Sequence, residues 1–294
     1  MKRSLLHISY PYLLLIPAFI LIFSVLCYPL MASLVLSFHK WTFSTYGEGR
    51  VPFIGLGNFI EMSADPYFWR SIVNTLIFSG SSLVMEFFLG LGVALLLNRK
   101  LVGTGMIRTL VILPFVLSNA VIGLNWRLMY NYDYGIINYF LSIFAIKPIL
   151  WLSDPTKAML SVIIVDVWNC TSFVVLLLLS GLQAIPQTPY EAAKIDGATG
   201  WQVFRFITLP LLRPVILVVL IWRTMDLFRC FDMIYILTGG GPGHATEVLS
   251  IYSYYKGFRY FNLGYAAAAA WVLVALIMIV CLGYLKLVRS EIID

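Results

Sequence analysis

Long apolar runs alternate with shorter polar segments along the whole chain, and this pattern predicts the architecture. Each run reaches roughly the 20 residues that an α-helix needs to cross a bilayer. Backbone groups in lipid must be paired within the segment itself, so such runs fold as helices. We therefore expect an all-α, polytopic membrane protein with six transmembrane helices. Their approximate bounds are 10–38, 71–97, 106–130, 158–182, 211–236 and 263–285.

A polar segment, residues 188–214, separates the fourth and fifth runs and begins with strong helix signals. Thr188 and Glu191 have the spacing of a capping box, and Pro189 suits the first helical position. Asp196-Gly197 then predicts a helix end, because glycine adopts the left-handed conformation readily. The sequence therefore predicts a short helix over this stretch.

A second helix start follows immediately in the same polar segment. Thr199 and Gln202 repeat the capping-box spacing. Pro210 lacks the backbone donor that a helix interior needs, so the second helix is predicted to stop before it. Two short helices in succession predict an elbow.

Composition agrees with the membrane prediction and excludes other classes. The chain is 61% hydrophobic and only 12% charged, and its mean hydropathy is +0.89. These values exclude a soluble globular domain. No linker or soluble segment interrupts the pattern, so we expect one domain over residues 1–294, with a core at 70–286 and the elbow at 186–210.

The distribution of Lys and Arg predicts the orientation. With six spans, both termini and the elbow share a side whose loops carry more Lys and Arg and a larger net positive charge than the loops opposite. The positive-inside rule places that side in the cytoplasm. The same bias explains a pI near 9.1 without any nucleic-acid partner.

Signatures of enzymes and metal sites are absent from the sequence. We find no GxxxxGK[ST] loop for ATP, no HExxH or GxSxG motif and no zinc-like Cys/His spacing. The four cysteines fall within the apolar runs, where they behave as small hydrophobic residues. We expect neither catalysis nor a cofactor on this chain.

Ionisable residues inside a membrane span are costly and predict function. The fifth run carries Arg223, Asp226, Arg229 and Asp232 at three-residue steps, which would place them along one side of a helix. The alternative is that these charges only pair with one another and with Asp166 or Arg127. Glu86 in the second run is interpreted as a contact between helices.

Two faces on the fourth and fifth runs could line a polar pathway. The helical period brings Asn169, Cys170 and Phe173 to one face of the fourth run, together with Asp166. The corresponding face of the fifth run holds Arg223, Asp226, Leu227 and Cys230, with Arg229 in the same stretch.

The elbow resembles a known motif position by position. The pattern Glu-Ala-Ala, three residues, Gly, nine residues, Ile, one residue, Leu-Pro is typical of permease subunits of binding-protein-dependent ABC importers. Residues 53–78, 149–186 and 238–242 are similar to the sugar-importing branch of that family, the permease family of the maltose transporter. In this chain the motif falls on Glu191, Ala192, Ala193, Gly197, Ile207, Leu209 and Pro210.

The resemblance implies the fold of type I ABC importers and a role in carbohydrate import. It implies that the motif residues and Asp196 contact an ATPase subunit, and that the two polar faces lie where the family contacts sugar. The implied partners are a second, homologous but different permease, two ATPase subunits that hold ATP and Mg²⁺, an extracytoplasmic binding protein and membrane lipids. The implied location is the bacterial cytoplasmic membrane.

Substrate identity stays open. Neutral oligosaccharides are the default expectation, whereas Arg127, Arg223 and Arg229 suggest an acidic uronate oligosaccharide of the alginate type, because guanidinium groups match carboxylates. Another small polar solute is an alternative cargo. An ion-coupled secondary transporter is the competing class, although such a protein does not need the elbow.

Overall fold

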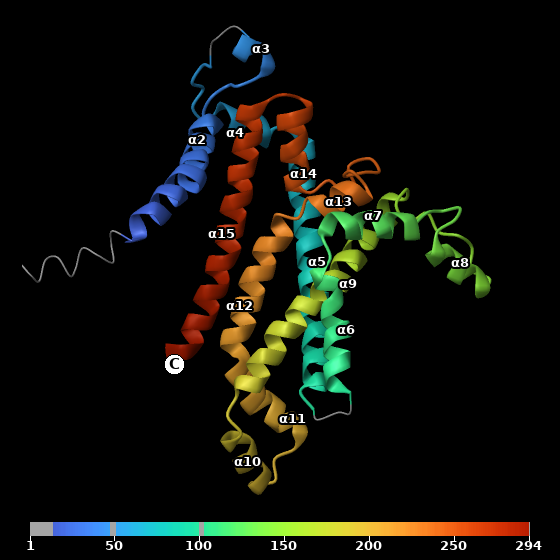
Figure 1. Ribbon diagram of the computed structural model, residues 1–294. Helices are drawn as coiled ribbons and strands as arrows, with labels where there is room; N and C mark the ends of the chain where they lie inside the picture. Colours follow the sequence, from blue (N-terminus) through green and yellow to red (C-terminus); the bar gives the residue numbers. More distant parts are fainter. Residues whose placement is uncertain (1–13, 48–50, 100–102, 294) are drawn as a thin grey trace, which may run out of the picture. The chain divides into compact units, whose positions relative to one another are not determined.

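The computed structural model describes residues 14–47, 51–99 and 103–293, and residues 1–13, 48–50, 100–102 and 294 lie outside the described part. The described residues are helices and their connections, with two isolated β-bridges and no strand. The predicted all-α class is confirmed (Figure 1). The N-terminal residues and residue 294, which we expect in the cytoplasm, fall outside the description.

Contacts divide the chain into two compact units. One comprises residues 1–65 and 253–272, and the other comprises 66–252 and 273–294. The extent of the predicted single domain and of its 70–286 core remains a prediction. Each unit is described separately below.

The larger unit contains the long helices that build the core. The π-helical turn η2 lies between two of them and continues the helical path. The bounds are α5 (Pro66–Leu97), α6 (Thr104–Val116), α7 (Asn119–Met129), α8 (Ile136–Ile143), α9 (Pro155–Ala184), α10 (Thr188–Ile195), α11 (Gly200–Val203), η2 (Phe204–Thr208), α12 (Leu209–Phe228), α13 (Asp232–Leu237) and the start of α14 (Leu249–Tyr254).

The smaller unit is built around the first apolar helix. Residues Leu14–Ser37 form one helix with a π-helical turn inside it. Asn58 fixes its end, because the side-chain amide donates to the carbonyls of Ser37 at 2.7 Å and His39 at 3.0 Å. The bounds are η1 (Phe23–Cys27), α2 (Tyr28–Ser37), α3 (Phe43–Gly47), α4 (Gly57–Ser63), η3 (Tyr255–Arg259) and the first part of α15 (Leu263–Ile293).

Five helices within the described residues are long and apolar enough to cross a membrane, and a bent pair raises the number to six. The bent pair corrects the predicted straight helix over 106–130. α6 and α7 meet at 95°, because Leu117 and Ser118 are extended, with ψ of 143° and 137°. Pro114, inside α6, lacks the donor for a helical hydrogen bond just before this break.

The fifth apolar run also differs from its prediction. α12 ends at Phe228, with Arg229 as its C-cap, and Asp232 opens the separate helix α13. The four charges from Arg223 to Asp232 therefore do not follow one helix face. The glycine-rich stretch at 238–247 is non-helical, as expected, but the long helix ends well before it.

The core of the larger unit lies between α5, α9 and α12. Leu91 and Ala94 of α5, Val174 and Leu178 of α9 and Leu212 of α12 are buried in one hydrophobic cluster. Small residues allow close approach: a Cβ at Gly90 would lie 2.5 Å from a Val174 methyl group. The core helices carry the elbow at their ends and a polar site between them, and both are described next.

Candidate functional site

The elbow begins with α10, one residue earlier than the sequence predicts. The carbonyl of Gln187 accepts from the amides of Tyr190 at 2.9 Å and Glu191 at 3.0 Å, and Gln187 itself is helical. Thr188 is thus already inside the helix, and its side chain makes no capping bond. The predicted capping box of Thr188 and Glu191 is wrong, because the helical turn starts before it.

The predicted end of α10 is present. Gly197 has φ +70°, and its amide donates to Lys194. The amide of Ala198 donates to the carbonyl of Ala193 at 2.9 Å. These two bonds form a Schellman motif, which reverses the chain sharply after Asp196.

The second half of the elbow has the expected cap but not the expected end. The Thr199 side chain accepts from the Gln202 amide, and the Gln202 side chain accepts from the Thr199 amide, so the capping box is present. The helix does not stop before Pro210. The amide of Leu209 bonds to Phe204, five residues back, and this π turn lets the path continue into α12 with the proline in its first turn.

The elbow exposes four of its eight predicted coupling residues. α10 and α11 lie beyond the ends of α9 and α12 (Figure 1). Of the other four, Ala193 is buried and three are half-buried. Glu191, Ala192, Asp196 and Gly197 are exposed, whereas Ile207, Leu209 and Pro210 are half-buried.

Large apolar side chains accompany these residues on the elbow. Ile195 is 86% exposed, and Trp201 and Phe206 are also mostly exposed. A cavity of about 290 Å³ lies between the two arms, lined by Asp196, Gly197, Ala198, Gln202, Val203, Phe206 and Ile207. Exposed apolar groups around a shaped hollow are typical of a protein-binding surface.

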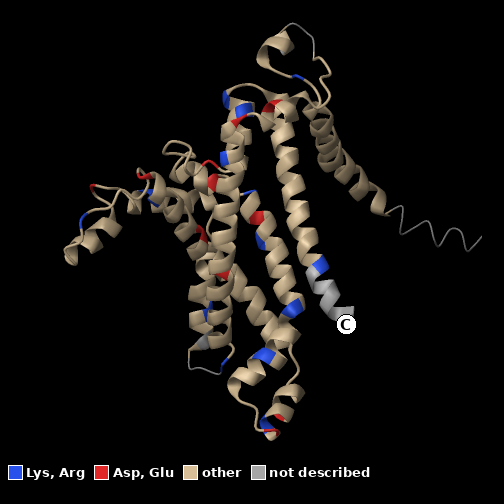
Figure 2. Cartoon of the chain, turned by 180° about the vertical axis from the view of Figure 1, so that it is seen from behind, with Lys and Arg blue, Asp and Glu red and all other residues tan. Residues whose placement is uncertain are grey.

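A buried ionic cluster joins the three core helices above the elbow. Figure 2 shows the long helices as largely uncharged, with charged positions at a few points between their ends. Arg223 of α12 is 0% exposed. Its Nε donates to Glu86 at 2.6 Å, and its Nη2 donates to Glu86 at 2.7 Å and to Asp166 at 3.0 Å. Its Nη1 donates to Asp226.

Two of the residues singled out in the sequence, Glu86 and Arg223, lie in this cluster. Glu86 is a contact between helices, as interpreted from the sequence. Arg223 pairs with Asp226 and Asp166, which is the pairing alternative. Four of the five N–H donors of Arg223 bind carboxylates from three helices, so its charge is already paired within the protein.

A polar cavity of about 230 Å³ adjoins the cluster. Asp166 and Asp226 contribute to both. Four of the eight pathway residues expected from the sequence line this cavity: Cys170, Asp226, Arg229 and Cys230. The complete lining is Asn119, Asp166, Cys170, Asp226, Arg229, Cys230, Phe231, Asp232 and Met233.

The other four expected pathway residues are not among the lining residues. Arg223 is in the ionic cluster, and Leu227 is buried. Phe173 packs between Phe115 and Trp222, with ring centroids 5.0 and 4.1 Å away. Asn169 is buried, and its amide nitrogen donates to the side-chain oxygen of Asn119 at 3.2 Å.

The cavity also contains residues that sequence reasoning missed. Asn119 and Met233 reach it because α6 breaks before α7 and α12 ends before α13. Arg127, near the end of α7, donates to the carbonyl of Ile236 at 3.1 Å. Hydropathy gives no signal for such breaks. The local signal available in the sequence was Pro114.

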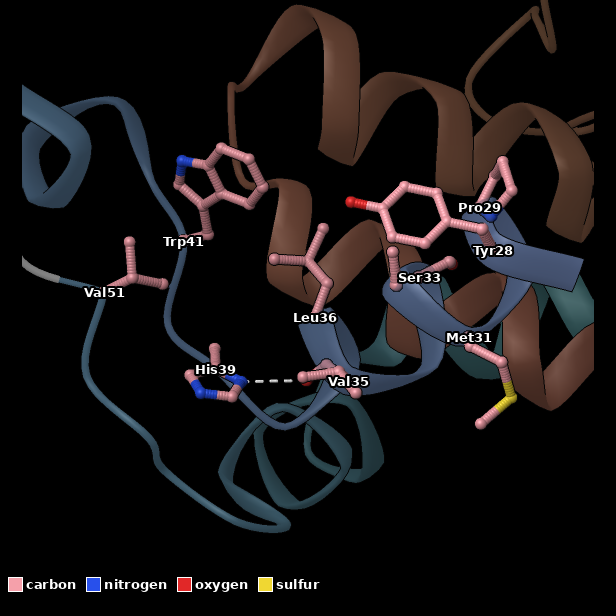
Figure 3. Close-up of a pocket in the computed structure, with 10 residues that line it drawn as sticks. Tyr28, Pro29, Met31, Ser33, Val35, Leu36, His39, Trp41 and Val51 are labelled. Carbon is pink, nitrogen blue, oxygen red and sulfur yellow. Dashed lines mark hydrogen bonds between the residues drawn. The ribbon is translucent and has the colours of Figure 1, made fainter. Parts of the chain in front are cut away.

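The smaller unit has a larger but apolar cavity, of about 860 Å³. It is lined by α2 and by the segment that follows it (Figure 3). His39 Nδ1 donates to the backbone carbonyl of Val35 at 2.8 Å, so its ring is engaged at the cavity edge. None of the expected site residues lies here.

No group of three or more His, Cys, Asp or Glu side chains within the described ranges could hold a metal ion. The ionic cluster contains its own cation in Arg223. The cavity lining combines charged side chains with neutral hydrogen-bonding groups, an arrangement that can orient a polar ligand.

Comparison with known proteins identifies relatives over nearly the whole chain. Residues 86–292 match the family described as binding-protein-dependent transport system inner membrane component. A trehalose/maltose transport system permease protein, MalF, from Thermococcus litoralis is 42% identical over 95% of this chain and 93% of its own length. A lactose transport system permease protein, LacF, from Rhizobium radiobacter is 36% identical over 94% of this chain and 92% of its own.

A solved structure has the same fold. It belongs to a bacterial ABC transporter involved in the import of the acidic polysaccharide alginate. It superimposes with a TM-score of 0.85 and 25% identity, covering 98% of each chain. A second structure of an alginate transporter, in complex with an alginate pentasaccharide-bound periplasmic protein, agrees equally well, with a TM-score of 0.85.

Proposed function

Because this chain belongs to the family of binding-protein-dependent transport system inner membrane components, we propose that it is the membrane-spanning subunit that carries an oligosaccharide through an ABC importer. It is a multi-pass permease of the inner membrane and a sugar ABC importer subunit. The relatives named above are permeases for trehalose, maltose and lactose. The chain itself is not an enzyme.

The observation that carries this proposal is the elbow. Its Schellman turn at Gly197 and its capping box at Thr199 hold two short arms at the end of the core helices. Exposed Ile195, Trp201 and Phe206 give it an apolar docking surface. α12 runs from the elbow to the ionic cluster and the cavity, so a push on the elbow has a rigid path to the polar site.

The mechanism is alternating access driven by partner subunits. Two ATPase subunits close on ATP and Mg²⁺ and displace the elbow, while an extracytoplasmic binding protein delivers the cargo. To reverse a 99:1 population of inward and outward states, ATP must favour the closed state by about 5.5 kcal/mol. No cofactor is required on this chain.

Assembly and orientation complete the proposal. The second permease is a homologous but different chain, and both termini and the elbow face the cytoplasm. The excess of Lys and Arg on that side supports this orientation. Glu191, Ala192, Asp196 and Gly197 contact the ATPase, whereas buried Ala193 shapes the arm that presents them.

An acidic oligosaccharide is the second candidate cargo. The alginate importers with the same fold favour it, at 25% identity. The trehalose/maltose and lactose permeases, at 42% and 36% identity, favour a neutral oligosaccharide, which is the default.

Affinity purification of the transporter through this chain tests the proposal. We expect two ATPase subunits, a second permease and a soluble binding protein to co-purify, and the binding protein to retain a saccharide. A variant with Trp201→Ala and Ile195→Ala should lose the ATPases but keep the second permease. Purification of the wild-type chain without any ATPase would contradict the proposal.

A further inference from the structure

Asp226 is the more exposed of the two carboxylates that both bind Arg223 and line the cavity, the other being Asp166. The Asp226 side chain is 35% exposed, while one carboxylate oxygen accepts from buried Arg223. The same residue lines the polar cavity. The cluster therefore fixes the orientation of this carboxylate and leaves part of it accessible.

Arg223 orients the Asp226 carboxylate and does not itself line the cavity. Its three guanidinium nitrogens donate to Glu86, Asp166 and Asp226. Because four of its five N–H donors already bind three carboxylates, its positive charge is offset within the protein and attracts a ligand carboxylate only weakly.

The charges that remain around the cavity are mainly negative. Asp166, Asp226 and Asp232 line it, against one lining cation, Arg229. Arg229 is exposed, and its Nε already donates to the carbonyl of Met225 at 3.1 Å. Since Arg223 also pairs with Glu86, the buried cluster adds no net positive charge. An anionic cargo therefore meets like charge in a low-dielectric site.

We propose that Asp226 determines specificity by accepting hydrogen bonds from the hydroxyl groups of an uncharged saccharide, and that Arg223 is the residue that positions it. This inference rests on the proposed function and narrows its cargo to neutral saccharides. Carboxylated saccharides are disfavoured by repulsion from Asp226 and Asp232.

The test uses the intact purified transporter and two matched probes. One is trehalose, and the other is its analogue with one glucose replaced by glucuronic acid. Binding of each is measured by equilibrium dialysis, without the binding protein, so that the transporter alone selects. We expect the wild type to prefer trehalose. Asp226→Asn should weaken trehalose binding about tenfold or more, the effect of one hydrogen bond to a charged group, and should narrow the preference.

Further variants separate positioning from folding. Arg223→Lys keeps the charge but cannot bridge three carboxylates. It should therefore also reduce the preference for trehalose over the glucuronate analogue. Asp232→Asn removes a lining charge outside the ionic cluster and should also reduce the preference for trehalose over the glucuronate analogue. This variant keeps the test usable if the variants in the cluster fail to assemble. Asp133→Asn, the same change in an exposed loop, should leave the binding of both probes unchanged.

The outcomes are distinct. A wild-type preference for the glucuronate analogue, or an unchanged preference in both Asp226→Asn and Asp232→Asn, would overturn the inference while leaving sugar import intact. Absence of ATP-dependent uptake of any saccharide by the wild type would instead overturn the proposed function.

Discussion

Arg223 and Glu86 meet through two hydrogen bonds of 2.6 and 2.7 Å, although 137 positions separate them in the chain. Both side chains are completely buried. The pair ties α5 to α12, and Asp166 adds α9 to the same guanidinium. The ionic cluster is thus the polar counterpart of the hydrophobic core between these helices.

Removal of the cation should destabilise the protein strongly. Arg223→Met leaves Glu86 and Asp166 buried without their partner, and breaking a buried ion pair typically costs about 3–5 kcal/mol. Thermal unfolding of the purified transporter should show a clear decrease in Tm. Glu86→Gln, which keeps a hydrogen-bonding group beside Arg223, should cost less. Equal melting of Arg223→Met and the wild type would contradict a structural role for the cluster.

Gly197 should be required for transport because of its backbone. Its φ is +70°, and a Cβ there would meet nothing within 4 Å, so a side chain is opposed by conformation and not by a clash. Gly197→Val should cost about 1–2 kcal/mol locally and reduce cargo-stimulated ATPase activity and uptake.

Gly200 offers a matched control for this change. It also has open space around it and no left-handed φ. Gly200→Val should reduce uptake less than Gly197→Val. If Gly197→Val inserts normally and leaves uptake and stimulated ATPase activity unchanged, the docking role of this turn is wrong.

Gly90 should be required for the contact between α5 and α9. A Cβ there would lie 2.5 Å from Val174, so Gly90→Ala forces the helices apart at a cost of about 1–3 kcal/mol. Gly92, two positions away and therefore on the other side of α5, has nothing within 4 Å. Gly92→Ala should be neutral or slightly stabilising. The Tm values of the two variants in detergent provide the check, and a smaller decrease for Gly90→Ala than for Gly92→Ala would refute the packing argument.

Local signals in the sequence were sufficient for the central turn of the elbow and not for its two outer ends. Gly197 ends α10, and Thr199 with Gln202 begins α11, because caps depend on residues within one turn. Thr188 was misassigned by one residue, since Gln187 is already helical. Pro210 did not end its helix, because a π turn precedes it.

Long-range features could be predicted only in part. The bend at Leu117 lies within an unbroken apolar run, so hydropathy alone indicates a straight span. Helical spacing placed Asp226 three residues from Arg223, but no spacing rule connects Arg223 to Glu86 on another helix. The cavity therefore combined expected residues, such as Asp226 and Cys170, with unexpected ones such as Asn119.

Cysteine labelling tests the topology. With the four native cysteines replaced by alanine, a cysteine at exposed Gly200 should react with a membrane-impermeant maleimide only from the cytoplasm. A cysteine at exposed Gly243 should react only from outside. Reaction of both from one side would overturn the orientation and the number of crossings.

Uptake by reconstituted vesicles tests the central claim most directly. The transporter purified through this chain is supplied with its loaded binding protein on one side and ATP on the other, and accumulated saccharide is measured. We predict that accumulation requires both, stops when vanadate blocks the ATPase subunits, and survives an uncoupler of the proton gradient. Accumulation that proceeds without ATP and collapses with the uncoupler would show instead an ion-coupled transporter and contradict the account.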